Sequence, residues 1–549
     1  MRTRIFNIEH NFLFLLTIFF VCTTSTLAYE NDKSIPDDRN HIDRMPESRG
    51  SINDFADAID KGFSNQLEQP FDLPRNLQFL TGRKEAFNAN RFDEVNNSSW
   101  YTNRNTYKQM SIEEIFAGPN QVSGPDTSST WTIIRAKADG VTPGFAIEDK
   151  NGDKFFIKFD PPGYFELASG AEVVTTKLFF AAGYWTPENY VVFFKPDILR
   201  MGEEVKFLDE KGRKRFMNED DLGDILKRVE ILPNGYIRAL ASRYIPGRPL
   251  GPFRYEGTVK DDPNDFIPHE HRRELRGLYV FGSWVNHIDS KAQNSLDSYI
   301  TDGDKRYVRH YLIDFGTCLG SGGRGPHPNH RGFENEIDPV AMFKKIITFG
   351  LVVEDYEKPD TVLFPSIGRF NSDNFEPNNF ASIFPNPAYE YMTIRDAYWG
   401  AKLVMSFTDD QIDAAVRAGR YSNPEAARYL ATQLKERRDI IGRYWFKKIA
   451  PLDNFDISNT EDSMFLSFKD MAVESNLESI DNVSYRYYFD KNQSERNILE
   501  DKSVLRIPIH NQETIYIEKM VDNRWSDPVG ITVGISSDSN KYSILKIDR

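Results

Sequence analysis

The chain has 549 residues, of which 13% are aromatic and 27% charged, and its formal net charge is −14 at pH 7. This length leaves room for about two to four domains with substantial hydrophobic cores. The acidic balance excludes general nucleic-acid binding as an expected role, because that role needs stripes of Lys and Arg to meet phosphate groups.

The first residues are typical of a secretory signal peptide. Arg2 and Arg4 supply a positive start, an apolar stretch occupies 12–21, and small residues at 26–28 resemble a cleavage site. We therefore expect residues 1–28 to direct export, and the protein to be secreted, periplasmic or on the cell surface. A membrane anchor is the alternative interpretation of the same segment.

The segment after this leader changes character twice. Residues 29–50 are polar and charged, and their composition predicts disorder. Apolar residues then recur at helical spacing from Ile52 to Phe63, behind a serine that could cap a helix. We expect 51–124 to form this helix followed by an irregular wrap.

Short β-rich runs separated by Gly-containing turns begin near Trp131, with WTIIRAK, GFAIEDK and KFFIKFD. The helical stretch FELASGAEVVTTKLFFAAGY follows, and NYVVFF and YIRALASRYI have the composition of further strands. Residues 125–245 are therefore predicted to form an antiparallel sheet with one inserted helix.

Helical patterns dominate 246–450, from HEHRRELRGLYVFGSWVNH to NPEAARYLATQLKERRDIIGRYWFKKI. Strand-like runs return over 451–549 at a spacing typical of a small β-sandwich. The sequence thus predicts an α+β protein with a β-rich lobe, a helical lobe and a separable, sandwich-like all-β domain at the C-terminus. We expect this last domain to bind a protein partner.

Two short motifs lie between the apolar runs of the predicted helical lobe. HIDSKAQN occupies 287–294, and DFG follows at 314–316. HIDSKAQN resembles the catalytic loop of protein kinases, and DFG resembles the metal-binding motif that accompanies it. The resemblance covers about 125–450 and implies the two-lobed protein-kinase-like fold.

The resemblance assigns a role to each polar residue of these motifs. Asp289 would orient the acceptor hydroxyl and take its proton, and Lys291 would neutralise the transferred phosphoryl group. Asn294 and Asp314 would hold Mg²⁺ or Mn²⁺, since hard oxygen ligands on short side chains suit such ions.

The upstream half of the pattern is also present. Lys158, in the strand FFIKFD, would grip the phosphates of ATP, and Gly140 and Gly144 would lie in the turn that covers them. Glu166 and Glu172 compete for the role of holding Lys158, because about 240° separates them around the predicted helix. Glu172 is preferred, because a carboxylate in the middle of an apolar helix is costly unless it is paired.

Some features depart from ordinary protein kinases. The nucleotide turn lacks GxGxxG, and no APE-like sequence follows DFG. In these respects the chain resembles atypical members of the superfamily, such as HipA-type, CotH-type and secretory-pathway kinases.

The implied function is ATP- and Mg-dependent transfer of the γ-phosphoryl group to a hydroxyl acceptor. The acceptor would be a protein or a small molecule that enters the cleft. A pseudokinase-like scaffold without phosphoryl transfer is the alternative. A zinc hydrolase built on His269 and His271 is disfavoured, because residues that are two positions apart on a helix lie on different faces.

Overall fold

The computed structural model describes residues 35–50, 82–136, 144–208, 214–358, 361–459, 463–507, 512–536 and 541–549. The predicted signal peptide and the predicted helix after Ser51 lie outside these ranges. Contacts divide the chain into two compact units, each described below by itself. The larger unit contains 37–87 and 98–445. The C-terminal unit contains 446–549, 88–97 and the residues before Asp37. Within the ranges above, no helix is both long and apolar enough to cross a membrane.

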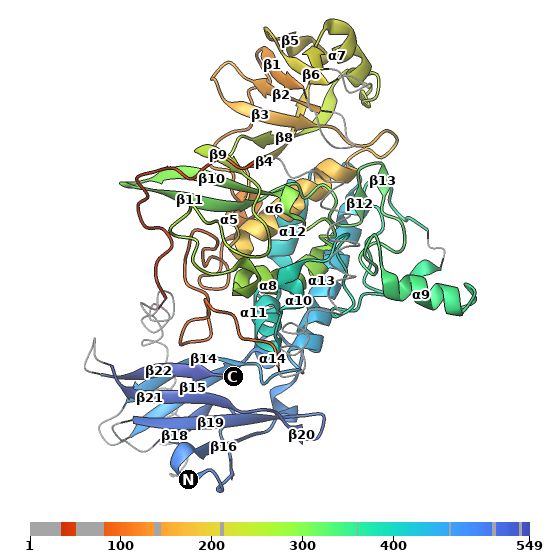
Figure 1. Cartoon of the computed structure of the whole chain (residues 1–549). Helices are drawn as coiled ribbons and strands as arrows, with labels where there is room; N and C mark the ends of the chain where they lie inside the picture. Colours follow the sequence, from red (N-terminus) through yellow and green to blue (C-terminus); the bar gives the residue numbers. More distant parts are fainter. Residues whose placement is uncertain are drawn as a thin grey trace, which may run out of the picture. The chain divides into compact units, whose positions relative to one another are not determined.

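A six-stranded sheet forms the β-rich part of the larger unit, in the order β4-β8-β3-β2-β1-β5 (Figure 1). Its strands are β1 (Trp131–Ala136), β2 (Gly144–Glu148), β3 (Lys154–Lys158), β4 (Asn189–Phe194), β5 (Leu199–Met201) and β8 (Ile237–Arg243). β5 is parallel to β1, which corrects the prediction of a wholly antiparallel sheet. The reason is that β5 follows β4 through a short 3-10 turn, yet it pairs at the opposite edge of the sheet.

The connection between the two edge strands also implies that this sheet is curled. Six flat strands would separate their edges by about 24 Å, whereas the five Cα–Cα steps from Phe194 to Leu199 span at most about 19 Å. The rings of Trp131 in β1 and Phe194 in β4 lie 4.7 Å apart, centroid to centroid. The concave side therefore encloses a core of aromatic and branched side chains.

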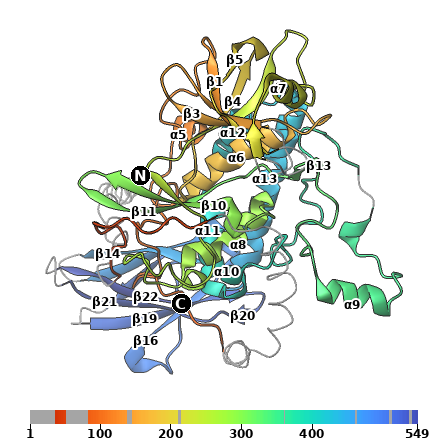
Figure 2. The ribbon, with the colours of Figure 1, turned by 45° about the horizontal axis from the view of Figure 1, so that its top comes forward.

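The inserted helix is α6 (Leu167–Ala182), and nearly all of its side chains are buried. It packs against β4 and β8 on one side and against α12 (Asp409–Ala418) on another (Figure 2). A helix enclosed in this way has to be apolar around most of its circumference. Glu172 is a buried exception near its middle.

The helical part of the larger unit is built on α8 (Arg273–Val285), α11 (Ile394–Met405), α12 and α13 (Pro424–Trp445), which pack on one another. The shorter helices are α5 (Ile112–Ala117), α7 (Glu219–Leu226), α9 (Pro339–Ile347) and α10 (Pro387–Glu390). This part also contains a three-stranded sheet that the sequence did not predict in full, with β9 (Arg248–Gly251), β10 (Ser295–Asp302) and β11 (Lys305–Leu312). Two pairs of short strands complete the unit. Three-residue strands form the first pair, β6 (Lys206–Leu208) with β7 (Lys214–Phe216), and two-residue strands form the second, β12 (Ser321–Gly322) with β13 (Gly325–Pro326).

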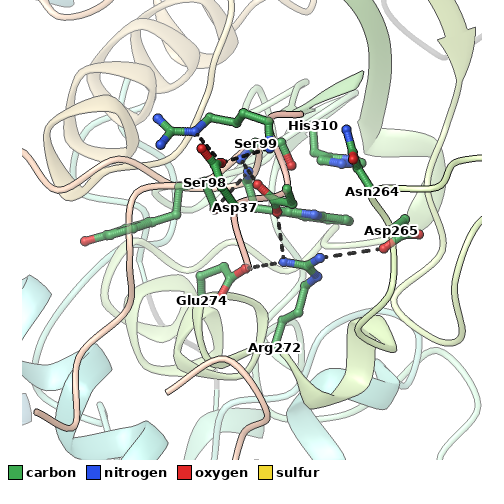
Figure 3. Close-up of polar contacts among 12 residues, drawn as sticks. Asp37, Ser98, Ser99, Asn264, Asp265, Arg272, Glu274 and His310 are labelled. Carbon is green, nitrogen blue, oxygen red and sulfur yellow. Dashed lines mark hydrogen bonds and ion pairs between the residues drawn. The ribbon is translucent and has the colours of Figure 1, made fainter. Parts of the chain in front are cut away.

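The leader residues before Gly50 pack on the larger unit, which corrects the prediction of disorder for 37–50. Asp38 and Ile42 are buried, and the Asp38 carboxylate accepts a hydrogen bond from the Ser99 backbone N–H at 2.7 Å. Arg272 lies 3.5 Å from Asp38 and is surrounded by further carboxylates (Figure 3). The polar composition of this segment suggested disorder because the partners of its buried carboxylate, Ser99 and Arg272, lie more than 60 residues away from Asp38.

The C-terminal unit consists of two sheets that share one core. The first contains β14 (Leu452–Asn459), β15 (Met464–Asp470) and β18 (Val504–Ile507). The second contains β16 (Tyr485–Phe489), β17 (Asn497–Ile498), β19 (Gln512–Val521), β20 (Arg524–Trp525), β21 (Val529–Ile535) and β22 (Tyr542–Asp548). A single turn of helix, α14 (Met471–Glu474), follows β15. Apolar residues from both sheets form one buried cluster, as in a β-sandwich.

A short segment from early in the chain belongs to this C-terminal unit. Phe92 is 3% exposed and is part of the shared core. The guanidinium of Arg549, at the end of the chain, lies 2.9 Å from the carboxylate of Asp93, and both side chains are buried. The unit therefore includes residues from early in the chain in addition to the stretch 451–549 that was predicted for it.

Candidate active site

Lys158 is the last residue of β3, a strand with paired neighbours on both sides, β2 and β8. Alternation along the strand buries Phe155 and Ile157 in the core below the sheet. The Lys158 ammonium lies 3.2 Å from both carboxylate oxygens of Glu172, which projects from α6. The Glu172 side chain is 3% exposed and that of Lys158 is 21% exposed, so the pair is largely shielded from water.

Asp314 forms a second ion pair with the same lysine. Its Oδ1 lies 3.0 Å from Lys158 Nζ, and its side chain is half exposed. Burial alone would lower the pKa of Lys158, but the carboxylates of Asp314 and Glu172 outweigh it and raise the pKa. The lysine is therefore firmly charged and positioned between two anions.

The two residues after Asp314 shape the backbone beside the Lys158–Glu172 pair. Asp314 has a φ of 61°, in the left-handed region that non-glycine residues seldom adopt, and Phe315 beside it is fully buried. A Cβ on Gly316 would lie 3.2 Å from a carboxylate oxygen of Glu172. Glycine therefore lets the chain pass close to the Lys158–Glu172 pair, while the buried ring anchors the strained aspartate.

The structure places Glu172, and not Glu166, beside Lys158. Glu166 is the N-cap residue of α6, and both its carboxylate oxygens lie 2.9 Å from the backbone N of Ser422. Capping of α6 is done instead by Asp160, which accepts hydrogen bonds from the backbone N–H groups of Glu166 and Ser169. The sequence analysis missed Asp160, although its position at the end of the β3 run, just before PPG, is compatible with a cap.

The loop 287–294 begins where α8 ends, at the left-handed C-cap residue Asn286. Asn294 donates hydrogen bonds from Nδ2 to the backbone O of Asp289 at 2.8 Å and to its Oδ2 at 2.9 Å. Lys291 Nζ lies 3.4 Å from the other carboxylate oxygen, Oδ1. Three of the predicted residues thus form one cluster, in which Asn294 fixes the orientation of Asp289.

The two oxygens of Asp289 differ in their engagement. Oδ1 is buried and accepts no hydrogen bond of normal geometry from any residue that the structure describes. Burial raises the pKa of Asp289, and the Lys291 ammonium opposes that rise. A carboxylate with one oxygen held by Asn294 and the other paired only with Lys291, at 3.4 Å, is suited to accept a proton from an incoming hydroxyl.

His287 and Cys318 have a structural role beneath this loop. His287 is fully enclosed, burial lowers its pKa to about 4, and its Nδ1 lies 3.3 Å from the sulfur of Cys318. Burial also raises the pKa of the Cys318 thiol. A neutral imidazole beside a protonated thiol offers neither a charged acid nor a reactive nucleophile.

The remaining predicted residues have simple outcomes. Gly144 begins β2 and pairs in register with Lys158, so its backbone lies directly opposite the lysine. Gly140 lies outside the described residues. His269 is hydrogen-bonded to Asp265 at 2.9 Å, and His271 is 2.6 Å from the Arg276 guanidinium. Neither histidine belongs to a cluster of metal ligands within the described ranges.

The donor set fits a hard divalent cation that keeps several water molecules. Both Nδ2 hydrogens of Asn294 are used within the loop. The side-chain carbonyl oxygen, Oδ1, therefore remains for another partner. Asp314 supplies a half-exposed carboxylate. No group of three or more His, Cys, Asp and Glu side chains gathers as a metal site in the part of the chain described. Mg²⁺ needs only one or two protein carboxylates when substrate phosphates complete its shell.

Comparisons with known proteins give no family. No protein-family description and no curated protein matches the chain. The solved structures that it matches include the Helicobacter pylori proinflammatory kinase CtkA, at a TM-score of 0.32 and 11% identity, over 58% of this chain and 97% of that chain. They also include the Golgi casein kinase, at 0.27 and 9%, over 76% of this chain and 95% of that chain.

The Golgi casein kinase with Mn/ADP bound matches at a TM-score of 0.24 and 12% identity, over 69% of this chain and 94% of that chain. All three structures are of kinases. TM-scores this low do not establish a shared fold, so the function has to be argued from the site itself.

Proposed function

We propose that this protein is a phosphotransferase of the atypical kinase type, which transfers the γ-phosphoryl group of ATP to a hydroxyl acceptor. The observation that carries the proposal is the Lys158 ammonium, held 3.2 Å from Glu172 and 3.0 Å from Asp314. A charged lysine fixed at the edge of a curled sheet is suited to bind the phosphates of a nucleotide.

The other residues have complementary roles in this proposal. Asn294 and Asp314 would hold Mg²⁺ or Mn²⁺, which when bound supplies positive charge to the phosphate oxygens. Oδ1 of Asp289, which lies 3.4 Å from Lys291 Nζ, accepts the proton of the acceptor hydroxyl as the hydroxyl oxygen forms a bond to the γ-phosphorus. The bond from that phosphorus to the bridging oxygen breaks, and ADP leaves. Lys291 stabilises the negative charge near the transferred group.

Two further parts of the proposal concern where the protein acts. The N-terminal signal-like sequence supports export, which would place the reaction outside the cytoplasm. The C-terminal unit contributes none of the site residues and has the form of a β-sandwich, so it is a candidate for binding a protein partner. The chemical nature of the acceptor, protein or small molecule, stays open in this proposal.

The test compares Asp289→Asn with the wild-type protein in the presence of Mg²⁺ and γ-labelled ATP, with and without candidate acceptors. Loss of a positioned base should reduce phosphoryl transfer by about two to four orders of magnitude and leave nucleotide binding intact. Asp304→Asn is the matched control, because Asp304 lies exposed in the turn between β10 and β11. If Asp289→Asn keeps near-normal turnover, Asp289 is not the base. If the wild type neither transfers phosphate nor hydrolyses ATP, the scaffold alternative is favoured.

A further inference from the structure

A polar cavity of about 70 Å³ lies within the larger unit, apart from the candidate active site. Its lining comes from five places: Asn286 at the end of α8, residues within 327–333 in the loop after DFG, Tyr356, residues within 369–380, and Arg437 in α13. None of the residues assigned to phosphoryl transfer lines it. The volume exceeds the 10–15 Å³ or so that a single water needs, but it is far too small for a nucleotide.

Arg437 carries a buried positive charge into this lining. The residue is 6% exposed, and its guanidinium donates to the backbone oxygens of Asn371 at 3.1 Å and Ser283 at 2.6 Å. The rings of Phe370 and Phe375 flank it at 4.5 and 3.8 Å. Among the described residues no carboxylate forms an ion pair with it, and burial lowers its pKa to about 9. Carbonyl dipoles and rings therefore stabilise this charge only in part.

Two more arginines face the same cavity. Arg331 forms an ion pair with Glu336 through Nη2, while its Nη1 is buried and makes no hydrogen bond with any residue in the described part of the chain. Arg369 donates from Nη1 to the backbone oxygen of His327 at 2.6 Å. Three arginines and one acidic residue, Glu376, line the cavity, and Arg331 is also paired with Glu336 outside it, so a smaller excess of positive charge remains.

His327 adds a neutral donor. It is 4% exposed, and neither ring nitrogen makes a hydrogen bond of normal geometry with a described residue, although the Thr317 backbone contributes a weaker polar contact. Burial, followed by repulsion from the Arg331 and Arg369 guanidinium groups, lowers its pKa to about 3. The ring is therefore uncharged and has one N–H group to donate.

These observations call for a compact anion with several acceptor atoms. Unsatisfied buried donors are costly, and guanidinium groups match the oxygens of phosphate and sulfate geometrically. We propose that the cavity is a binding site for a phosphate-class oxyanion, held by Arg331, Arg369, Arg437 and His327. This inference goes beyond the phosphotransferase proposal, and the binding itself does not depend on it.

The surroundings of the site suggest what occupancy would do. The backbone N–H of Leu319 donates to Val285 at 2.8 Å, and those of His327 and Arg369 donate to Gly320 at 3.0 and 3.3 Å. The first bond joins the loop after DFG to the end of α8, where 287–294 begins, and the other two hold His327 and Arg369 to Gly320 of the same loop. An oxyanion bound by His327, Arg331 and Arg437 would hold this loop to α13, and the hydrogen bond from Arg437 to the backbone oxygen of Ser283 would connect it to α8. The predicted consequence is a more rigid loop at Asp289.

The experiment titrates inorganic phosphate and sulfate into nucleotide-free, metal-free protein by calorimetry, against chloride at equal ionic strength. We expect saturable binding of both oxyanions and at least tenfold weaker binding in Arg331→Gln. Arg438→Gln is the control, because Arg438 follows Arg437 in α13 but pairs with Asp409 and Asp439 outside the cavity. Its side chain is 13% exposed, close to the 17% of Arg331. Binding should be unchanged in this control.

Two more variants separate the alternatives. Lys158→Met should retain oxyanion binding, and His327→Phe, which keeps an aromatic ring but removes the donor, should weaken it severalfold. If the purified chain already carries a phosphoryl group that blocks the site, intact mass will show it and phosphatase treatment should restore binding, which supports the same site with a covalent source. The proposal is overturned if no saturable binding occurs with or without that treatment. It is also overturned if Arg331→Gln and Arg438→Gln behave alike, or if only Lys158→Met abolishes binding.

Discussion

Removal of the lysine from the Lys158–Glu172 pair should destabilise the larger unit more than removal of the carboxylate. Glu172 is 3% exposed, so Lys158→Met removes the ammonium group that faces a buried carboxylate. If that carboxylate stayed charged, breaking the buried pair would cost about 3–5 kcal/mol. In Glu172→Gln, by contrast, Lys158 keeps Asp314 at 3.0 Å and partial exposure to water. We expect a loss of about 1.5–3 kcal/mol there, the usual value for a hydrogen bond to a charged group.

Protonation of Glu172 limits the cost in Lys158→Met and makes it depend on pH. At pH 7 a carboxyl with an ordinary pKa near 4.3 can be protonated for about 3.7 kcal/mol, so the penalty cannot exceed that figure. Burial would raise the folded-state pKa of Glu172 above its unfolded value in this variant, so the folded chain binds the extra proton. The stability of the variant should therefore rise, relative to wild type, as pH falls. At pH 5 the same reasoning limits the destabilisation by Lys158→Met to about 1 kcal/mol.

Urea unfolding followed by tryptophan fluorescence measures this effect in the full-length chain. Six of the seven tryptophans lie within 98–445, so the signal reports mainly on the larger unit. Lys158→Met, Glu172→Gln and the double variant should be compared at pH 7 and pH 5. The double variant should be more stable than Lys158→Met at pH 7. Equal losses for the two single variants, or a Lys158→Met penalty that does not change with pH, would refute the reasoning.

Two further predictions concern the metal and the boundary of the C-terminal unit. Asp314→Ala should abolish the strengthening of ATP binding by Mg²⁺ in calorimetry, and retention of the wild-type metal dependence would show that Asp314 is not a ligand. A chain that ends at Pro451 should still bind ATP, whereas residues around Phe92, which is buried in the core of that unit, should lose their protection from hydrogen exchange. Unchanged protection there, or lost nucleotide affinity, would contradict this division of the chain.

Much of the local structure follows from the sequence because its causes are local. The alternation in KFFIKFD predicted β3, and the apolar periodicity after PPG predicted α6, since side-chain direction repeats every two residues in a strand and every 3.6 in a helix. The placement of Asp289, Lys291 and Asn294 in one loop was predicted from the resemblance of HIDSKAQN to the kinase catalytic loop. Given the Lys–Glu pair that the resemblance implies, the preference for Glu172 over Glu166 needed only helix geometry and the cost of a buried charge.

The tertiary structure decided everything that depends on contacts between distant segments. Residues 37–50 look disordered alone, because their polar groups find partners such as Ser99 and Arg272 only in the folded chain. Phe92 joins the core of strands that begin at Leu452, and no periodicity near Phe92 announces this. The oxyanion cavity is assembled from α8, the loop after DFG and α13, so its charge excess is invisible along the chain. Sequence patterns record side-chain direction within an element, whereas burial and charge neutralisation depend on which elements meet in space.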